Sequence, residues 1–141
     1  HVLFAPSWGE GKNLPALEFM TTGGVVAASD FGGHQGWMSS EYAYPLAGDV
    51  VDNMPREHPG CKSFRVRRES LMETMIHMYR NRDELKHKAD LASRIIPATM
   101  SWDAKVNKFF EKLAENHPEK GKEILMRYQM GKRDAPTLPG E

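Results

Sequence analysis

Two short apolar runs separated by a loop and a helix-forming stretch constrain the fold of this chain more than any other feature. The runs, Val2–Ala5 and Val25–Ser29, have the length and composition of strands buried on both faces of a parallel sheet. Between them lie a glycine-bearing loop at 7–13 and a stretch, Leu14–Met20, with a helical pattern. The connection is long enough to bring the second strand back parallel to the first. The pattern therefore predicts a βαβ unit and an α/β fold.

Both ends of the predicted helix are marked in the sequence. Asn13 is the expected N-cap, because its short polar side chain can accept a hydrogen bond from the first turn. Pro15 is tolerated in that turn, where its missing N–H would have no partner. Gly23 and Gly24 are expected to end the helix.

The next part of the chain is predicted to contain short elements and one long loop. Gly32–Gly33 forces a turn before a short helix through Trp37, and 42–44 is a candidate third strand. Residues 48–62 are rich in Asp, Asn, Pro and His, which favours a surface loop of unusual length. A short edge strand is predicted at 64–66.

The remainder is predicted to be helical. Ser70 and Glu73 have the spacing of a capping box at the start of one helix, Pro97 should end the next, and Ser101 should cap a third. A fourth helix opens at Pro118. Apolar residues recur at helical spacing in the first two helices: Leu71, Met72, Met75, Ile76 and Tyr79, then Leu85, Ala89, Ala92 and Ile96. The nine methionines are interpreted mainly as core filler.

Glu10 and Glu18 flank the start of the first predicted helix. Glu10 lies in the loop at the carboxyl end of a strand, where open α/β sheets bind ligands, and Glu18 lies one turn into the helix. Free N–H groups of the first helical turn favour an anion such as a diphosphate, and a carboxylate can accept hydrogen bonds from two neighbouring hydroxyls. The arrangement suits a nucleoside diphosphate sugar. The alternative is one Glu stabilised by the helix dipole and another in contact with water.

A longer pattern surrounds the two glutamates. It comprises Ala5-Pro6-Ser7, Glu10-Gly11, Leu14-Pro15-x-Leu17-Glu18, Gly23-x-Val25-Val26-Ala27 and Gly32-Gly33, and later Gly48-Asp49 and Ser101-Trp102. In this order, from about Val2 to Leu113, it resembles the retaining glycosyltransferases of family 4. These enzymes have two facing Rossmann-like domains, of which the C-terminal one binds the donor nucleotide. The resemblance implies a partial Rossmann-like parallel sheet of about three to four short strands, followed by a helical C-terminal half.

The resemblance also implies roles for individual residues. Glu18 resembles the carboxylate that holds the ribose hydroxyls, and Glu10 resembles the catalytic one, which contacts the donor sugar near the reacting carbon. The backbone amides expected to face the sugar and phosphates are those of Gly11, Lys12, Asn13 and Leu14. The family commonly has Gly at the positions of Lys12 or Asn13, but Asn tolerates left-handed backbone angles and can preserve the loop. Lys12 either assists the diphosphate or points to water.

Other candidate site residues are few. Ser7 and His34 are candidates for the pocket wall, although His34 can instead cover the short helix after Gly33. No G-x-S-x-G pattern surrounds Ser7, which argues against a nucleophilic hydrolase. Among six histidines only His58 is near ligand spacing from Cys61, and two ligands do not close a zinc site. Neither a metal nor another cofactor is expected.

The expected partners are a nucleotide sugar, an undefined acceptor and a further domain of the same protein. The chain opens directly in an apolar run, which predicts that it is part of a longer polypeptide whose N-terminal domain is missing. Residues 1–117 would form the second half of the donor-binding domain, and 118–141 a short helix and flexible tail from Gly131. Such a part should not catalyse transfer alone. A non-catalytic binding or interaction module with a nucleotide fold is the main alternative. A nucleotide-sugar epimerase is a minor one, disfavoured because epimerases generally lack the paired glutamates.

Composition excludes some partners. Lys plus Arg and Asp plus Glu both equal 19, so the neutral chain has no overall attraction to nucleic acid. No apolar run is long enough to cross a bilayer, and Cys61 has no second cysteine to pair with. A cytoplasmic location is expected. The basic cluster at 65–68 is interpreted as a solvated edge or as a peripheral membrane or phosphate contact.

Overall fold

The computed structural model describes residues 1–52 and 60–133. The chain divides into two compact units, His1–Met100 and Ser101–Glu141. This division reflects how the residues pack. It does not test the predicted functional boundary between 117 and 118, which stays a prediction.

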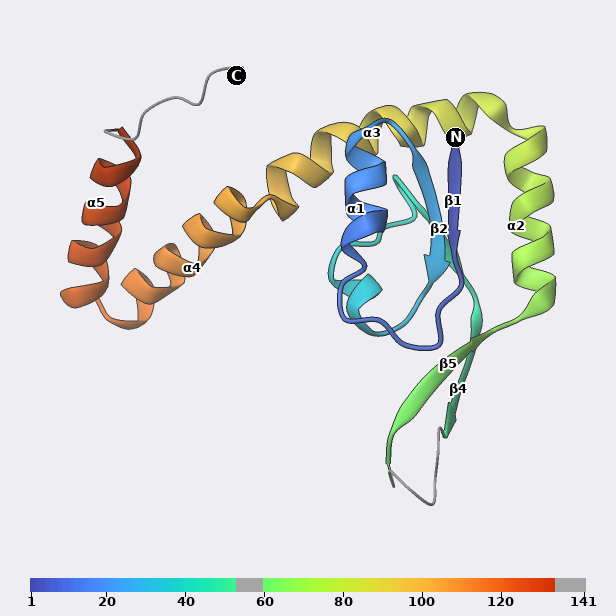
Figure 1. Cartoon of the computed structure of the whole chain (residues 1–141), viewed down its shortest axis with the longest axis horizontal. Coiled ribbons are helices and arrows are strands. Elements are labelled where there is room, and N and C mark those ends of the chain that lie inside the picture. The colour runs from blue at the N-terminus through green and yellow to red at the C-terminus, as the bar shows by residue number, and fades with distance from the viewer. Residues whose placement is uncertain (53–59, 134–141) are drawn as a thin grey trace. The chain divides into compact units, whose positions relative to one another are not determined.

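A three-stranded parallel sheet forms the centre of the first unit (Figure 1). Strands β1 (Val2–Ala5), β2 (Val25–Ser29) and β3 (Tyr44–Leu46) are hydrogen-bonded in that order, with β2 in the middle. Helix α1 (Leu14–Thr21) connects β1 to β2. The predicted α/β fold with a parallel sheet and a largely helical C-terminal half is confirmed, and the third strand begins two residues later than expected.

The two faces of β2 enter separate apolar clusters. Val26 and Ala28 pack with α1 and the later part of α3 (Arg82–Met100), whereas Val25 and Ala27 pack with β3, α2 (Arg68–Arg80) and the earlier part of α3. Figure 1 shows α1 and α2 on opposite sides of the sheet. Every residue of β2 is buried, as the continuous apolar run predicted.

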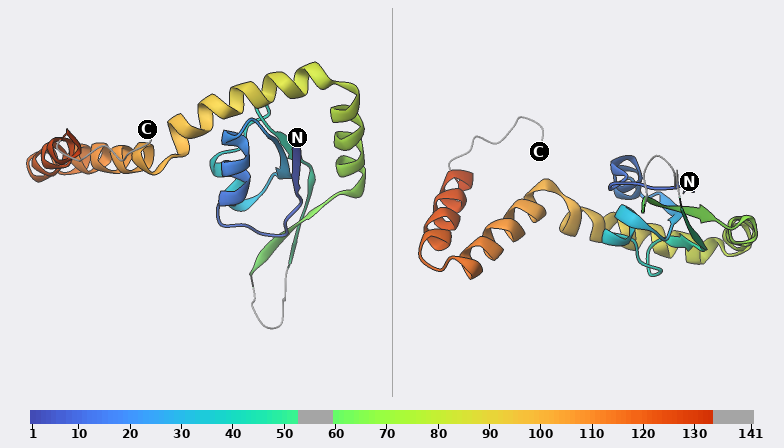
Figure 2. Two further views of the ribbon diagram at one scale, coloured as in Figure 1. Left: turned by 45° about the horizontal axis from the view of Figure 1, so that its top comes forward. Right: turned by 90° about the horizontal axis from the view of Figure 1, so that it is seen from below.

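The prediction of a surface loop over 48–62 is wrong for residues 48–52 and 62, which belong to strands. Residues Gly48–Asp52 form strand β4, which pairs antiparallel with β5 (Lys62–Val66), and Val50 lies opposite Phe64. The β4–β5 pair extends away from the three-stranded sheet (Figures 1 and 2). Gly and Asp are disfavoured in strands, but cross-strand pairing outweighs this local preference. Residues 53–59 lie outside the described part, and the predicted strand at 64–66 is confirmed.

Two predicted helix boundaries are also wrong. Helix α2 begins at Arg68, and Ser70 does not cap it but accepts a hydrogen bond from the backbone N–H of Ala47 at 2.9 Å. Pro97 lies inside α3, which continues to Met100. Burial of Ile96 and packing of Met100 against the α1 side of the core favour continuation of the helix, against a local cost of about 3 kcal/mol for proline. The predicted short helix after Gly32 is a 3-10 helix, η1 (Gly32–Gly36), which ends one residue before Trp37.

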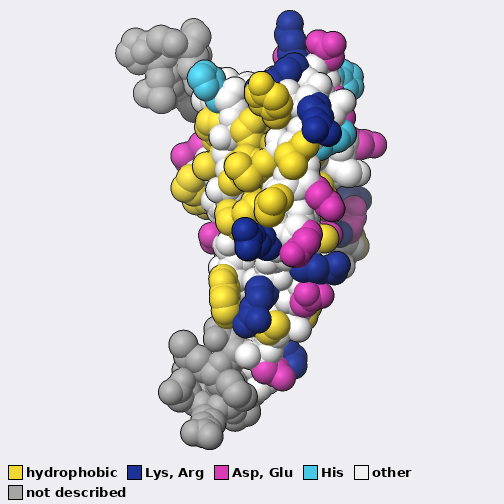
Figure 3. Space-filling view, turned by 90° about the vertical axis from the view of Figure 1, so that its right-hand side faces the viewer, with side chains coloured by type: hydrophobic (Ala, Val, Ile, Leu, Met, Phe, Trp, Pro, Cys, Tyr) yellow, Lys and Arg dark blue, Asp and Glu magenta, His cyan; other side chains and the backbone are white. Residues whose placement is uncertain are grey.

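The apolar stripe of α2 is mostly exposed. Met72, Met75, Ile76 and Tyr79 are 46 to 72% exposed, whereas Met78 on the inner face is 3% exposed. Figure 3 shows hydrophobic side chains gathered on one face of the molecule. The interpretation of the methionines as core filler therefore holds for Met78 but not for Met72 or Met75.

The second unit consists of two packed helices, α4 (Trp102–Asn116) and α5 (Lys120–Arg133). Ser101 caps α4 as predicted, accepting a hydrogen bond from the Ala104 N–H at 3.2 Å. Helix α5 continues to Arg133, and 134–141 lie outside the described part, so the predicted flexible tail stays a prediction. Within the described ranges, none of the helices is both long and apolar enough to cross a membrane.

Candidate functional site

The loop after β1 is fastened to the segment after β2 at the carboxyl end of the sheet. The Ser29 hydroxyl donates to the carbonyl of Ser7 at 2.7 Å, and the Gly33 N–H donates to the carbonyl of Glu10 at 2.9 Å. These two hydrogen bonds attach Ser7 and Glu10 of the loop to the end of β2 and to the residues that follow it. The conformation of the loop that carries the predicted site therefore depends on contacts with the segment after β2 as well as on the sequence of the loop.

Trp37 and two residues of β5 add three further attachments. The indole Nε1 of Trp37, itself buried, donates to the carbonyl of Lys12 at 2.7 Å. The guanidinium of Arg65 on β5 lies 5.5 Å from the ring centre of Trp8, and the N–H of Phe64 donates to the Trp8 carbonyl at 2.6 Å. These contacts attach the backbone of Trp8 and Lys12 to β5 and to Trp37.

Gly33 is the point of closest approach between the two segments. A Cβ atom at this position would lie 1.8 Å from the Gly11 carbonyl oxygen and 2.7 Å from that of Glu10. Real Cβ atoms do not approach backbone oxygens so closely, so only glycine allows this contact. The Gly32-Gly33 pair thus allows a turn and also a close approach between this segment and the backbone of Glu10 and Gly11.

Asn13 and His34 form the buried end of the loop. Asn13 caps α1 with positive φ, 61°, and its Oδ1 accepts a hydrogen bond from the Ala16 N–H at 3.3 Å. Its Nδ2 lies 3.0 Å from Nε2 of His34, whose Nδ1 lies 2.9 Å from the Ser29 carbonyl. A carbonyl can only accept, so Nδ1 carries the proton and Nε2 accepts from Asn13. The prediction that Asn13 caps the helix and tolerates left-handed backbone is confirmed.

Three consecutive backbone N–H groups at the start of α1 have no acceptor in the described part of the chain. Among residues 1–52 and 60–133, nothing accepts a hydrogen bond from the amides of Lys12, Asn13 or Leu14, whereas the Gly11 amide donates to its neighbour Glu10 at 3.0 Å. Unpaired amides next to a left-handed residue at a helix N-terminus are donors that can bind an anion. The geometry can therefore hold a phosphate or carboxylate group.

The predicted site residues lie at this carboxyl end of the sheet but differ in burial. Glu10 and Glu18 are exposed, Glu10 in the loop and Glu18 one turn into α1. Lys12 is half-buried and forms no ion pair with the described residues. Ser7 contributes its carbonyl to the loop attachment, and His34 is fully buried. His34 is therefore a support beneath the loop.

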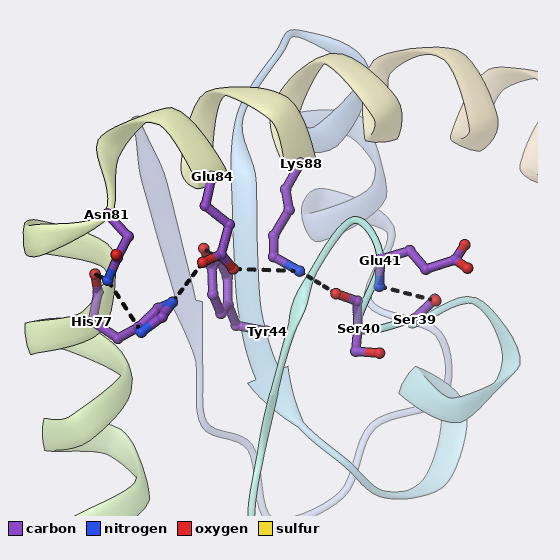
Figure 4. Close-up of polar contacts among 8 residues, drawn as sticks. All are labelled: Ser39, Ser40, Glu41, Tyr44, His77, Asn81, Glu84 and Lys88. Atoms are coloured by element: carbon purple, nitrogen blue, oxygen red, sulfur yellow. Dashed lines mark hydrogen bonds and ion pairs between the residues drawn. The ribbon is translucent and has the colours of Figure 1, made fainter.

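A second polar cluster joins β3, α2 and α3 (Figure 4). Glu84 accepts hydrogen bonds from His77 at 2.8 Å and from the Tyr44 hydroxyl at 3.1 Å, and it pairs with Lys88 at 3.7 Å. Asn81 approaches the other ring nitrogen of His77 at 3.2 Å. The His77 hydrogen bond holds the pKa of Glu84 below its ordinary value, and burial raises that of Tyr44.

Four residues of this cluster, Tyr44, His77, Glu84 and Lys88, line an open pocket of about 340 Å³. The other lining residues are Ser40, Ala43, Pro45, Glu73 and Thr74. Because Glu84 contacts side chains from all three elements, the cluster links α2 and α3 to β3. Local sequence patterns gave no signal for it, since its members lie far apart along the chain.

No metal centre is present among the described residues, in which no group of three or more His, Cys, Asp or Glu side chains could hold an ion. His58 of the weak His58–Cys61 pair lies outside the described residues, and Cys61 is exposed. No family model matches the chain, and neither a curated protein nor a solved structure matches it.

Proposed function

We propose that residues 1–117 bind a nucleotide sugar as the donor-binding part of a retaining glycosyltransferase. The further parts of the same polypeptide supply the acceptor site and the rest of the donor pocket. The observation that carries this proposal is the run of open amides at Lys12, Asn13 and Leu14, flanked by the exposed carboxylates of Glu10 and Glu18. The sequence resemblance to family 4 supports the same assignment independently of the geometry.

The open amides suit the diphosphate of such a donor. A hydrogen bond from an amide to a charged oxygen contributes about 1.5 to 3 kcal/mol, and the helix dipole adds about 0.3 to 1 kcal/mol for an anion at the N-terminus. The loop backbone is already held by Trp37 and by Gly33, so little ordering entropy opposes binding. This region suits an anion of one or two phosphate groups.

The carboxylates then distinguish a nucleotide sugar from free phosphate. In the proposed complex Glu18 accepts hydrogen bonds from the ribose hydroxyls, and Glu10 accepts them from the donor sugar near the reacting carbon. Transfer of the sugar to an acceptor hydroxyl proceeds with retained configuration. Metal-independent chemistry follows from the family resemblance. The 141-residue chain alone, without an acceptor site, is expected not to transfer sugar.

Titration calorimetry of the full-length polypeptide with uridine and guanosine diphosphates tests the proposal. Glu18→Ala should weaken binding about tenfold to a hundredfold, because a charged hydrogen-bonding partner worth about 1.5 to 3 kcal/mol is lost. The matched control is Glu111→Ala, an exposed glutamate on α4, which should bind like the wild type. Absence of binding by the wild type, or equal binding by both variants, would contradict the donor assignment.

One observation favours the alternative of a binding module without catalysis. Lys12 is the only Lys or Arg among residues 1–55, so this part of the chain offers little charge to stabilise a departing diphosphate. The two functions separate in the full-length polypeptide. A glycosyltransferase should lose turnover in a Glu10→Ala variant while still binding nucleotide, whereas a binding module should show no sugar transfer before or after that change.

A further inference from the structure

An exposed apolar stripe on α2 forms a surface that the rest of the described chain leaves uncovered. The stripe consists of Met72, Met75, Ile76 and Tyr79, which lie on one face of the helix because they are spaced at three and four residues. These side chains are 46 to 72% exposed, whereas Met78 on the opposite face enters the core. Figure 3 views the molecule from the side on which α2 lies and shows hydrophobic side chains gathered there. Contiguous apolar side chains on a surface indicate an interaction site.

The stripe borders an open groove between α2 and the edge strand β1. The groove has a volume of about 190 Å³, and its lining includes Met75 and Tyr79 of the stripe and Val2 and Phe4 of β1. The guanidinium carbon of Arg82 lies 5.1 Å from the centre of the Tyr79 ring, and this contact stabilises the position of the ring beside the groove. A flexible, unbranched side chain such as methionine fills an irregular gap of this kind well.

The spacing of the stripe is the same in both directions along the helix, which suits a second copy of the chain. A twofold axis between Met75 and Ile76 would place α2 antiparallel to α2 of the partner copy. Met72 would then lie opposite the partner's Tyr79, next to the groove of that copy, and Met75 would lie opposite the partner's Ile76. A contact of this kind uses the same patch on both copies and closes at two.

Charged side chains beside the stripe complement each other in the same arrangement. Glu73 and Arg80 are exposed and form no ion pair with the described residues. Because they are seven residues apart, they lie on the same flank of the stripe, one in each half of α2. In the antiparallel pair, Glu73 of each copy would lie within one helical turn of the partner's Arg80. The formal net charge of the chain is zero, so no net repulsion opposes the approach of a second copy.

We propose that the chain forms a twofold-symmetric dimer through the apolar stripe of α2. Stable interfaces use about 20 to 30 residues from each partner, and the stripe with its flanking charges and groove provides fewer. The dissociation constant is therefore expected to be on the order of 10 to 100 µM. Below that concentration the chain is a monomer with the stripe exposed, and its unfolding then reports the stability of the monomer. The dimer does not depend on nucleotide binding at the loop after β1.

Sedimentation equilibrium of the 141-residue chain tests the dimer, at concentrations from about a tenth of the expected dissociation constant to about ten times that value. Ile76→Asp places a carboxylate next to the twofold axis in each copy, and should weaken association at least about tenfold. Ile124→Asp on α5 is the matched control, because Ile124 is 43% exposed and Ile76 is 46% exposed, and it should associate like the wild type. A wild type that stays monomeric throughout, or equal weakening by both variants, would overturn the proposal.

Exchange of the flanking charges tests the antiparallel arrangement. Glu73→Arg should weaken association about tenfold, because the new guanidinium would face the partner's Arg80 in two symmetric contacts. Combining Glu73→Arg with Arg80→Glu restores opposite charges across the axis and should recover the wild-type dissociation constant. Circular dichroism checks that each variant is folded. A double variant that associates no better than Glu73→Arg would overturn the docking mode. A full-length polypeptide that stays monomeric at the same concentrations would assign the stripe to another part of that polypeptide and overturn the dimer.

Discussion

The contact of Gly33 with the Gly11 carbonyl yields the strongest quantitative prediction. In Gly33→Ala the new methyl group would lie 1.8 Å from Gly11 O, 2.2 Å from Gly11 C and 2.7 Å from Glu10 O. All three atoms are backbone, so no side-chain rotation can relieve the overlap and the loop must move away. Overpacking costs about 1 to 3 kcal/mol, and loss of the Gly33 to Glu10 hydrogen bond adds about 1 kcal/mol. Destabilisation of about 2 to 4 kcal/mol is expected.

Gly36 provides the matched control. It lies in the same short helix as Gly33, but a Cβ at Gly36 would meet nothing within 4 Å. Gly36→Ala should therefore change the free energy of unfolding by less than about 0.5 kcal/mol. Urea denaturation followed by the fluorescence of the buried Trp37 measures both variants. Equal midpoints for the two would refute the close backbone approach on which the loop geometry depends.

Two further predictions concern stability. Because the His77 hydrogen bond lowers the pKa of Glu84 below 4.5, the carboxylate stabilises the fold above that pH and loses this contribution as pH falls through the lowered value. Glu84→Gln should lower the urea midpoint at pH 7 and flatten the decline of that midpoint below pH 4.5. An unchanged pH profile would contradict the stabilising role of the Glu84–His77 contact. Met78→Ala, at a side chain 3% exposed, should cost about 2 to 4 kcal/mol. Met72→Ala, at 48% exposed, should cost less than about 0.5 kcal/mol, and equal losses by thermal unfolding would show that the inner face of α2 is misassigned.

The elements that the sequence predicted well are those with strong local signals. The apolar run of β2 predicted a buried strand, and Asn13 carried both a cap and a left-handed backbone preference, all of which the structure confirms. Local sequence signals gave wrong predictions where contacts with residues far along the chain determine the secondary structure. Strand β4 exists because β5 pairs with it, and α3 passes through Pro97 because residues on either side pack on the core.

The candidate site also has features that local sequence predicted and features that only contacts between distant residues determine. Sequence alone placed Glu10, Glu18 and the amides of 11–14 around the carboxyl end of one strand, because the order strand, loop, helix determines where a loop lies on a parallel sheet. It did not show that Trp37, Gly33 and Ser29 hold that loop, nor that the Gly11 amide is taken by Glu10. Those are contacts between separate segments.

His34 shows the difference most clearly. Its sequence position, directly after two glycines at the end of a strand, permitted either a pocket wall or a cover for the short helix. Only the tertiary structure places its ring between the Ser29 carbonyl and the Asn13 amide with no exposed surface. Local sequence determined the strands, the cap and the glutamates through short-range backbone preferences. Long-range packing decided which groups are buried together, and thus which of them can bind and which only support.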